Sequence, residues 1–558
     1  MPTLTELTAL AEAWVADDPD PQTRAELTSL LADARDSDEE ALVELTDRFS
    51  GLLEFGTAGL RGALGAGPNR MNRVVVIRTA AGLTAYLKER LGEGASPTVV
   101  IGFDARHNSD IFARDTAAVV TAAGGRAMVL PRPLPTPVLA FAIGHLGADA
   151  GVMVTASHNP PQDNGYKVYL GDGSQIVPPA DADISAHVGA VPSASSVPLA
   201  ASGWETLGDA LVDRYIEAAA AVVAPDSPRQ VSIVHTALHG VGSDTVRAAF
   251  AAAGFPEPQS VLTQSAPDPE FPTVSFPNPE EPGAIDAALA QARRVQPDLV
   301  LANDPDADRC AVAVEGPEGW RMLRGDEVGA LLGQHIINRG VDPAGERTVL
   351  ARSIVSSRLL GAMARAAGLP AEETLTGFKW IGRVPGLRYG YEEALGYCVD
   401  PGTVPDKDGV SAALLVAELA ATLKQEGRTV LDVLDDLART HGVHQTDAFS
   451  VRVEDLSLIT AVMQRLRTSP PSELGGVAIA SVEDLSEGAG GLPPTDGLRY
   501  LLDDDTRVIV RPSGTEPKLK VYLEAIVPVT DGDLTGARQE AARRLGAVRG
   551  AMEALTRT

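Results

Sequence analysis

Ser157 lies in a stretch whose residue types could support nucleophilic chemistry on a bound ligand. The apolar run Gly151-Val-Met-Val154 ends at Thr155-Ala-Ser-His-Asn-Pro160, and proline cannot continue the strand or start a helix there. We therefore expect a strand followed by an exposed loop that carries Ser157. Ligands of open parallel α/β sheets bind where such loops leave the carboxyl ends of strands. The alternative is a polar turn without a catalytic role. Other unusual stretches of the sequence distinguish the two interpretations.

Three carboxylates, Asp304, Asp306 and Asp308, alternate along one short segment. Carboxylates this close repel one another unless a hard divalent cation neutralises them, so the segment predicts a metal site. An EF-hand calcium loop is the competing interpretation, because Glu315 stands at its twelfth position. That interpretation is disfavoured, since Arg309 occupies the place that needs glycine and the flanking residues are typical of strands.

Two further segments could bind an anion such as phosphate. In the glycine-rich segment 55–62, Arg61 can present a bidentate donor while the glycines let the backbone approach the anion closely. Segment 511–517, Arg-Pro-Ser-Gly-Thr-Glu-Pro, is expected between two strands, where loop amides could surround an anion. The side chains that could assist there are Arg511, Ser513 and Thr515.

Lys379, Glu392 and Glu393 are candidates for contact with a ligand. Lys379 stands beside Trp380 on a predicted glycine-bounded loop, either as a cation at the edge of the core or as a substrate contact. We count it among the candidate substrate-binding residues. The two glutamates are expected on another loop, where carboxylates commonly accept hydrogen bonds from hydroxyl groups.

Two other polar pairs have structural interpretations. His235 and His239 have helical spacing, but the glycines that follow favour a turn over a zinc site. Asp104 and Arg106 follow a predicted strand and are interpreted as an internal ion pair that supports their loop.

The elements that would position these residues alternate between strands and helices along most of the 558 residues. Leucines at helical spacing predict helices over residues 1–53, and the segment 191–202, rich in proline, serine and alanine, is typical of a linker. The final segment combines helices with longer strands and predicts an α+β domain. At roughly 150 residues per domain, the length predicts three or four domains.

The composition, 44% hydrophobic and 22% charged, is that of a globular protein. A net charge of −28 disfavours nucleic-acid and membrane binding, so an anionic ligand needs local arginine and lysine clusters. Only two cysteines, Cys310 and Cys398, argue against a disulfide framework and fit a reducing cytoplasm. The N-terminus lacks a signal-type apolar core, and no run of residues reaches the length of a membrane span. We therefore expect a cytoplasmic protein.

In this order the motifs resemble those of the α-D-phosphohexomutase superfamily, the phosphoglucomutases and phosphomannomutases. The resemblance covers nearly the whole chain. It rests on a phosphoserine loop, a metal loop, a sugar loop and a phosphate loop, at residues 155–160, 304–309, 392–394 and 511–517. The helical extension before residue 55 and the proline-punctuated segment 276–282 resemble the branch with phosphopentomutase or bisphosphate-synthase relatives.

The resemblance implies an α/β fold of four domains around a central cleft. Three would be mixed α/β domains with mainly parallel sheets, and the fourth a smaller α+β domain that can swing over the substrate. The expected domains carry the phosphoserine after a helical extension, the metal site, the sugar loop and the phosphate loop, at residues 1–205, 206–320, 321–444 and 445–558.

The resemblance also implies interconversion of hexose 1-phosphate and hexose 6-phosphate through a phosphorylated Ser157. Hexose 1,6-bisphosphate would be the intermediate, and glucose 1,6-bisphosphate the activator. Mg²⁺ would be held by the three aspartates and a phosphoserine oxygen of Ser157, and would neutralise charge on the transferring group. Arg61 and Arg309 would stabilise the same charge. His158 would pack beside the nucleophile, and Lys167 is a candidate general acid or base.

For the substrate, the resemblance implies that Glu392 and Glu393 read sugar hydroxyls. The non-reacting phosphate would be gripped by Arg511, Ser513, Gly514 and Thr515. Many relatives carry serine after the glutamates, whereas this chain has Ala394, which removes a hydroxyl contact. Glucose is the expected sugar, and phosphomannomutase or phosphopentomutase activity is the alternative.

Two other classes of function are alternatives. A non-catalytic sugar-phosphate-binding protein could have lost Ser157, an aspartate or Arg61, yet all are present. A serine hydrolase is disfavoured, because Ser157 lacks the Gly-x-Ser-x-Gly turn and the acidic loop would have no role. The expected partners are small sugar phosphates, without nucleic acid or membrane, and the chain is expected as a monomer or homodimer.

Overall fold

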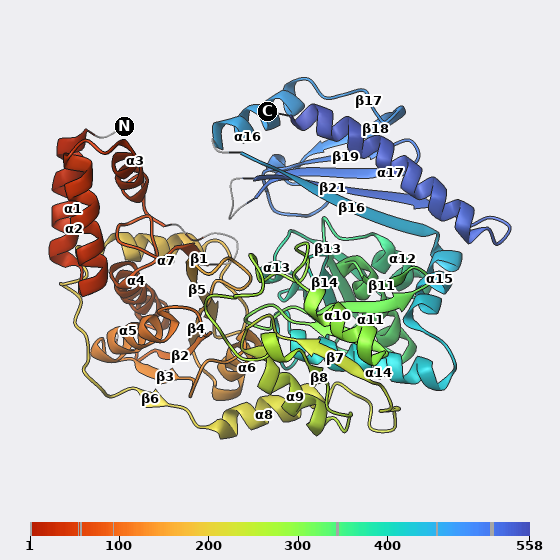
Figure 1. Ribbon diagram of the computed structural model, residues 1–558, viewed down its shortest axis with the longest axis horizontal. Coiled ribbons are helices and arrows are strands. Elements are labelled where there is room, and N and C mark those ends of the chain that lie inside the picture. The colour runs from red at the N-terminus through yellow and green to blue at the C-terminus, as the bar shows by residue number, and fades with distance from the viewer. Residues whose placement is uncertain are drawn as a thin grey trace. The chain divides into compact units, whose positions relative to one another are not determined.

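The computed structural model describes residues 3–53, 55, 59–92, 94–341, 345–453, 456–513 and 518–557 (Figure 1). They form two compact units. The first contains residues 1–315 and 402–414, and the second contains residues 316–401 and 415–558. Each unit is described by itself.

The first unit begins with three helices: α1 (Leu4–Asp17), α2 (Pro21–Arg35) and α3 (Glu39–Arg48). Thr3, Asp20 and Asp38 cap their N-termini, each with a side-chain oxygen that accepts from a backbone N–H of the first turn. Leucines at the predicted helical spacing form a small core, so the predicted helical extension is confirmed.

The first sheet of this unit has the strand order β1-β5-β4-β2-β3-β6. Strands β2, β3, β4 and β6 run parallel, and the antiparallel β5 connects them to β1. Their bounds are β1 Leu60–Ala63, β2 Thr98–Phe103, β3 Arg126–Val129, β4 Ala150–Val154, β5 Asp163–Leu170 and β6 Glu205–Thr206. The accompanying helices are α4 (Arg73–Leu91), α5 (Ser109–Ala122), α6 (Thr136–Leu146) and α7 (Ala180–Gly189). Buried side chains of the sheet and of α4, α5 and α7 pack together in one core.

A second sheet contributes the neighbouring strands β10-β9-β7-β8 to this unit. Strand β7 is parallel to both β8 and β9, and β10 is antiparallel to β9. The strands are β7 (Ile233–Thr236), β8 (Gln259–Ser260), β9 (Leu299–Ala302) and β10 (Ala311–Gly316), with helices α8 (Asp209–Ala220), α9 (Gly242–Ala252) and α10 (Asp286–Val295). Strand β7 ends at Thr236, so His235 lies within it. His235 Nε2 lies 2.8 Å from Asn303 Oδ1, and His239 Nε2 lies 2.8 Å from Thr273 Oγ1.

The second unit contains a sheet of order β13-β12-β14-β15, in which β12 is parallel to both β13 and β14. The strands are β12 (Val349–Ser353), β13 (Ala371–Thr374), β14 (Leu387–Glu392) and β15 (Gly396–Cys398), preceded by β11 (Gly319–Met322). The helices are α11 (Gly325–Asn338), α12 (Leu359–Ala366), α13 (Phe378–Ile381), α14 (Gly409–Gln425), which begins in the first unit, and α15 (Val430–His441).

The last sheet is antiparallel throughout, with the order β16-β21-β20-β19-β18-β17. Its strands are β16 (Val443–Arg452), β17 (Glu473–Leu474), β18 (Val477–Asp484), β19 (Leu498–Leu502), β20 (Arg507–Pro512) and β21 (Lys518–Val527). Helices α16 (Leu456–Thr468) and α17 (Leu534–Thr556) accompany it, and apolar residues of the sheet and α17 share a core. The predicted α+β terminal segment is confirmed.

The prediction of a loop is wrong for Lys379 and Glu392 and correct for Glu393. Lys379 lies in the short helix α13 rather than on a loop, because Phe378 and Ile381 turn inward onto a small apolar cluster. Glu392 is the last residue of β14, and Glu393 begins the turn that follows.

Both cysteines are buried free thiols, and burial raises the pKa of Cys310 to about 12. Among the described residues, each helix is too short or too polar to cross a bilayer.

Candidate active site

Ser157 lies on the loop between β4 and β5, as predicted, but it is buried rather than exposed. Its backbone adopts a left-handed conformation with φ of 52°, and its N–H donates to Thr155 Oγ1 at 2.8 Å. The hydroxyl Oγ donates to Asp304 Oδ2 at 2.8 Å and lies 3.2 Å from His158 Nδ1. A left-handed backbone at a non-glycine residue costs free energy and commonly marks a functional position. The loop thus aims the hydroxyl at the acidic segment.

Arg106 explains how this loop is held. Its guanidinium donates to the backbone oxygens of Ser157, Asn159 and Pro160 at 2.5–2.8 Å and makes an ion pair with Asp104 at 3.3 Å. The predicted ion pair is therefore present, and its arginine also clamps the loop that carries the nucleophile.

Asp304, Asp306 and Asp308 follow strand β9 and are all buried. One carboxylate oxygen from each can be chosen so that the three oxygens lie within 4.8 Å of one another. The segment packs tightly on the loop after β7, because a Cβ at Gly240 would lie 2.3 Å from Pro305 Cα. Val241 N–H also donates to the Pro305 carbonyl at 2.8 Å. Glycine at position 240 therefore permits this approach of the two loops.

Three cationic side chains surround the aspartates. Lys167 Nζ, from β5, lies 2.7 Å from Asp306 Oδ2 and 2.8 Å from Asp308 Oδ2. Lys407 Nζ lies 2.9 Å from the same oxygen of Asp308. Arg309 Nε is 3.8 Å from carboxylate oxygens of Asp304 and Asp308. Opposite charges thus compensate in the buried cluster.

The environment drives the aspartate pKa values apart. Burial and the neighbouring carboxylates of Asp308 and Asp306 raise the pKa of Asp304 well above its ordinary value. Burial alone would also raise the pKa of Asp306, but the ammonium of Lys167 and the hydroxyl of Thr136 hold it below the ordinary range. Asp304, which accepts from Ser157, therefore protonates more readily than Asp306.

The cluster fits a hard divalent cation. Oδ1 of Asp306 and Oδ1 of Asp308 are buried and accept no hydrogen bond from any described residue. Buried carboxylate oxygens without a donor are costly, and a magnesium-type cation prefers such oxygen ligands. The donor set therefore suits Mg²⁺ better than a soft metal.

Arg61 and His158 flank the serine. Arg61, on β1, donates to Asn159 Oδ1 at 3.1 Å, and its Nε is buried without a hydrogen-bond partner among the described residues. Burial lowers the pKa of Arg61 from its very high ordinary value. Burial, with Arg309 and Arg61 nearby, lowers the pKa of His158 well below its ordinary value, so the imidazole is neutral. A neutral ring beside two guanidinium groups leaves the positive charge to the arginines.

The second unit holds the remaining candidates. The Glu393 carboxylate accepts from the hydroxyls of Ser353 and Ser356, each at 3.2 Å, and its N–H donates to Ser356 Oγ at 3.0 Å. Arg511 donates from the end of β20 to Thr376 Oγ1 at 2.5 Å. Ser513 N–H donates to the Lys518 carbonyl at 2.8 Å and so closes the base of the predicted phosphate loop. Gly514 and Thr515 lie outside the described residues.

Comparison with known proteins decides the family. The sequence matches the phosphoglucomutase/phosphomannomutase alpha/beta/alpha domains I, II and III at residues 52–194, 213–319 and 324–441. It matches the C-terminal domain of the same family at residues 450–529. The chain belongs to the phosphoglucomutase/phosphomannomutase family.

The similar proteins of this family include several mutases. A probable phosphomannomutase of Haemophilus influenzae is 47% identical over 82% of this chain and 93% of its own length. The phosphopentomutase of Mus musculus is 35% identical over 96% of this chain and 93% of its own. The crystal structure of a Thermus thermophilus protein assigned to the phosphomannomutases has a TM-score of 0.69, with 26% identity over 88% of this chain and 99% of that one. The chain is therefore a mutase enzyme with the four-domain α/β architecture of the family, as predicted.

Sequence reasoning missed Lys407. Asp406-Lys-Asp-Gly409 leads into α14 and delivers the Lys407 ammonium group to Asp308. Asp406 accepts from Tyr169 and Gln175, and Asp408 accepts from Tyr215. A lysine between two aspartates before an apolar helix was the available signal. This local pattern does not reveal that the segment lies against Asp308, which follows β9.

Proposed function

We propose that the chain interconverts hexose 1-phosphate and hexose 6-phosphate, with glucose preferred, through a phosphoryl group carried on Ser157. The observation that carries this proposal is the buried Ser157 hydroxyl 2.8 Å from Asp304 in a three-aspartate cluster. In the first half-reaction the bond between phosphorus and Ser157 Oγ breaks while a bond to the free sugar hydroxyl forms. The resulting hexose 1,6-bisphosphate reorients in the site. The bond from its other phosphate to the sugar oxygen then breaks as a new bond to Ser157 Oγ forms.

The residues around Ser157 have separable roles in this proposal. Arg61 and Arg309 stabilise negative charge on the transferring group, since phosphoryl transfer depends mainly on positioning and electrostatics. His158, neutral and beside Oγ, orients the serine. Lys167 is the candidate for moving a proton, and its ammonium contacts the carboxylates of Asp306 and Asp308.

Asp304, Asp306 and Asp308, with a phosphoserine oxygen of Ser157, would hold Mg²⁺. When bound, the cation supplies charge neutralisation at the transferring phosphoryl group. Lys407 contacts the same aspartate as Lys167 and adds positive charge there. Glucose 1,6-bisphosphate would serve as activator, since it phosphorylates Ser157.

The substrate contacts belong to the second unit. Glu392 and Glu393 accept hydrogen bonds from sugar hydroxyls, and Lys379 is a further contact to the substrate. The phosphate that does not react is bound by Arg511, Ser513, Gly514 and Thr515. We assign the phosphoserine, the metal site, the sugar loop and the phosphate loop to domains spanning 1–205, 206–320, 321–444 and 445–558. Cytoplasmic activity is consistent with two buried free cysteines.

Pentose phosphate is the second candidate substrate, favoured by the similarity to a mouse phosphopentomutase. The test is a coupled assay of glucose 1-phosphate conversion with Mg²⁺, seeded with glucose 1,6-bisphosphate and run beside mannose 1-phosphate and ribose 1-phosphate. Ser157→Ala serves as the inactive control. Preference for glucose supports the proposal, preference for another sugar moves the specificity, and no turnover of any of the three contradicts it.

A further inference from the structure

The turn after β12, Ser353–Ser356, is the support of the sugar-loop carboxylate. Its two serine hydroxyls lie 2.8 Å apart, and both donate to Glu393 Oε2. Ser356 Oγ also accepts the Glu393 N–H, so this serine fixes the backbone and the side chain of Glu393 together. Gly325 closes the other side, because a Cβ there would lie 1.8 Å from the Glu393 carbonyl oxygen. The position of Glu393 therefore follows the position of the turn.

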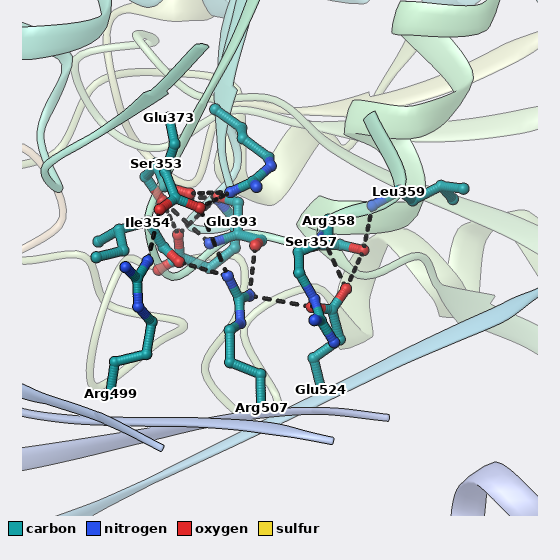
Figure 2. Close-up of polar contacts among 12 residues, drawn as sticks. Ser353, Ile354, Ser357, Arg358, Leu359, Glu373, Glu393, Arg499, Arg507 and Glu524 are labelled. Atoms are coloured by element: carbon teal, nitrogen blue, oxygen red, sulfur yellow. Dashed lines mark hydrogen bonds and ion pairs between the residues drawn. The ribbon is translucent and has the colours of Figure 1, made fainter. Parts of the chain in front are cut away.

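Arg507 of β20 holds the same turn from the C-terminal sheet (Figure 2). Its guanidinium donates to the carbonyl of Ile354 through Nη1 and to that of Ser356 through Nη2, both at 2.7 Å. The side chain is buried, and its charge is balanced by Glu524, the residue directly opposite on β21, at 3.2 Å. A planar guanidinium bridges two carbonyls and a carboxylate from separate nitrogens, whereas an ammonium group offers its donors from a single point.

Alternate residues of β20 face this turn. Ile509 and its cross-strand neighbour Tyr522 pack with Ile354 and Val355 of the turn in one apolar cluster. Arg511, two residues further along this face of β20, donates to the hydroxyl of Thr376, which follows β13. Because side chains two and four residues apart share one face of a strand, β20 carries the turn clamp and the phosphate-loop arginine on the same face.

We propose that Arg507 is a positioning residue that couples the phosphate-binding hairpin to the sugar-binding Glu393 through the Ser353–Ser356 turn. This rests on the proposed function, in which Glu393 reads sugar hydroxyls and Arg511 binds the distal phosphate. Both ends of a sugar phosphate are then read by groups whose spacing Arg507 fixes. Loss of Arg507 leaves the phosphoryl-transfer groups of the first unit unchanged and loosens that spacing.

Arg507→Met is the principal variant, and Arg499→Met is its matched control. Arg499 also extends from the C-terminal sheet and makes an ion pair with Glu373 at 2.7 Å, but no hydrogen bond from it to the turn is present among the described contacts. We expect Arg507→Met to raise KM for the sugar phosphate roughly 10- to 100-fold with a smaller change in kcat, since misplacement of about 1 Å costs up to about 100-fold. Arg499→Met should change KM less than about threefold.

A double-mutant cycle with Ser356→Ala tests the coupling itself. The two substitutions interrupt one chain of contacts, so their effects on kcat/KM should be clearly less than additive. The ratio of kcat/KM for glucose 1-phosphate to that for ribose 1-phosphate should also fall in Arg507→Met, because Glu393 loses its fixed place. Additive effects, or an Arg499→Met variant as impaired as Arg507→Met, would overturn the proposal.

Folding is controlled separately. Arg507→Met removes one of the two guanidinium partners of the buried Glu524 carboxylate, so the variant Arg507→Met with Glu524→Gln is measured beside it. Arg507→Lys keeps the charge but cannot bridge both carbonyls, and full rescue by lysine would show that charge alone matters. If the wild-type enzyme turns over no sugar phosphate, the proposed function fails first. If it does turn over and the cycle is additive, only the coupling fails.

Discussion

Lys407 Nζ lies 2.9 Å from Asp308 Oδ2, the oxygen that also accepts from Lys167. Two ammonium groups on one buried carboxylate oxygen leave the opposite oxygen of Asp308 free of hydrogen bonds from the described residues. Both lysines therefore add positive charge at the same oxygen of Asp308, and the other oxygen remains the one without a hydrogen-bond donor in the described part of the chain.

Lys407→Met should lower kcat roughly 100-fold, because removing one preorganised positive group from a buried phosphoryl-transfer site has an effect of that order. Mg²⁺ affinity, measured by titration calorimetry, should stay equal or increase, since a cation that competes for Asp308 is removed. The exposed Lys424→Met variant is the control. Unchanged kcat would contradict a role for Lys407 in turnover.

Ser157→Ala should abolish turnover of glucose 1-phosphate while substrate still binds. Intact-mass analysis after incubation with glucose 1,6-bisphosphate should show one added phosphoryl group on the wild type and none on the variant. The left-handed backbone at Ser157 is as strained for alanine as for serine, so the melting temperature should change little. A phosphorylated Ser157→Ala protein would show that another residue carries the group.

Removal of Mg²⁺ by EDTA should abolish turnover, and added Mg²⁺ should raise the melting temperature of the wild type. The physical reason is that the cation relieves repulsion among three buried carboxylates. In Asp306→Asn the Mg²⁺-dependent rise in melting temperature should be lost. Because this readout does not depend on turnover, an equal rise in both proteins would exclude Asp306 as a ligand.

Gly240→Ala should destabilise the first unit by roughly 1–3 kcal/mol, because the added Cβ would overlap the backbone of Pro305. The shift of Pro305 would displace the aspartates beside it, so Mg²⁺ affinity should fall as well. Gly144→Ala is the matched control: the space around a Cβ at that helical position is open, and alanine there should be neutral or stabilising. Equal unfolding midpoints for the two variants would contradict the predicted overlap.

Glu524→Gln tests the buried ion pair of the second unit through its pH dependence. Burial alone would raise the pKa of Glu524, but Arg507, His444 and Arg358 hold it well below the ordinary value. A carboxyl whose pKa is depressed by folding stabilises the protein above its unfolded pKa and loses that contribution as the pH falls through the folded pKa. At about pH 7 the variant should therefore be less stable by about 3 kcal/mol, and the difference should shrink below about pH 4.

Urea unfolding at several pH values measures this difference. Glu540→Gln is the control, since Glu540 is partly exposed on a helix surface and pairs with Arg543 and Arg544, which lower its pKa to about 2. Its substitution should leave the unfolding midpoint almost unchanged. A pH-independent difference for Glu524→Gln would contradict the charged state assigned to this carboxylate.

The local part of this fold could be predicted from the sequence. Periodicity and strand-ending polar residues placed Ser157 and the three aspartates after β4 and β9, because these signals reside in neighbouring residues. The burial of Ser157 could not be predicted, since the Arg106 clamp and Asp304 come from distant segments. Lys407 and Arg507 were missed for the same reason: their partners are fixed by packing between segments far apart in the chain.

The assignment of residues 402–414 to the first unit has a consequence for synthesis on the ribosome. The Ser157 loop and all three aspartates are synthesised before the segment 316–401, whereas Lys407 is synthesised only after it. At about 5–20 residues per second, that interval is on the order of ten seconds. During this interval the nascent first unit holds Asp308 without one of its two lysines. Its fold is completed only by residues 402–414, which residues 316–401 of the second unit separate from the rest of the first unit.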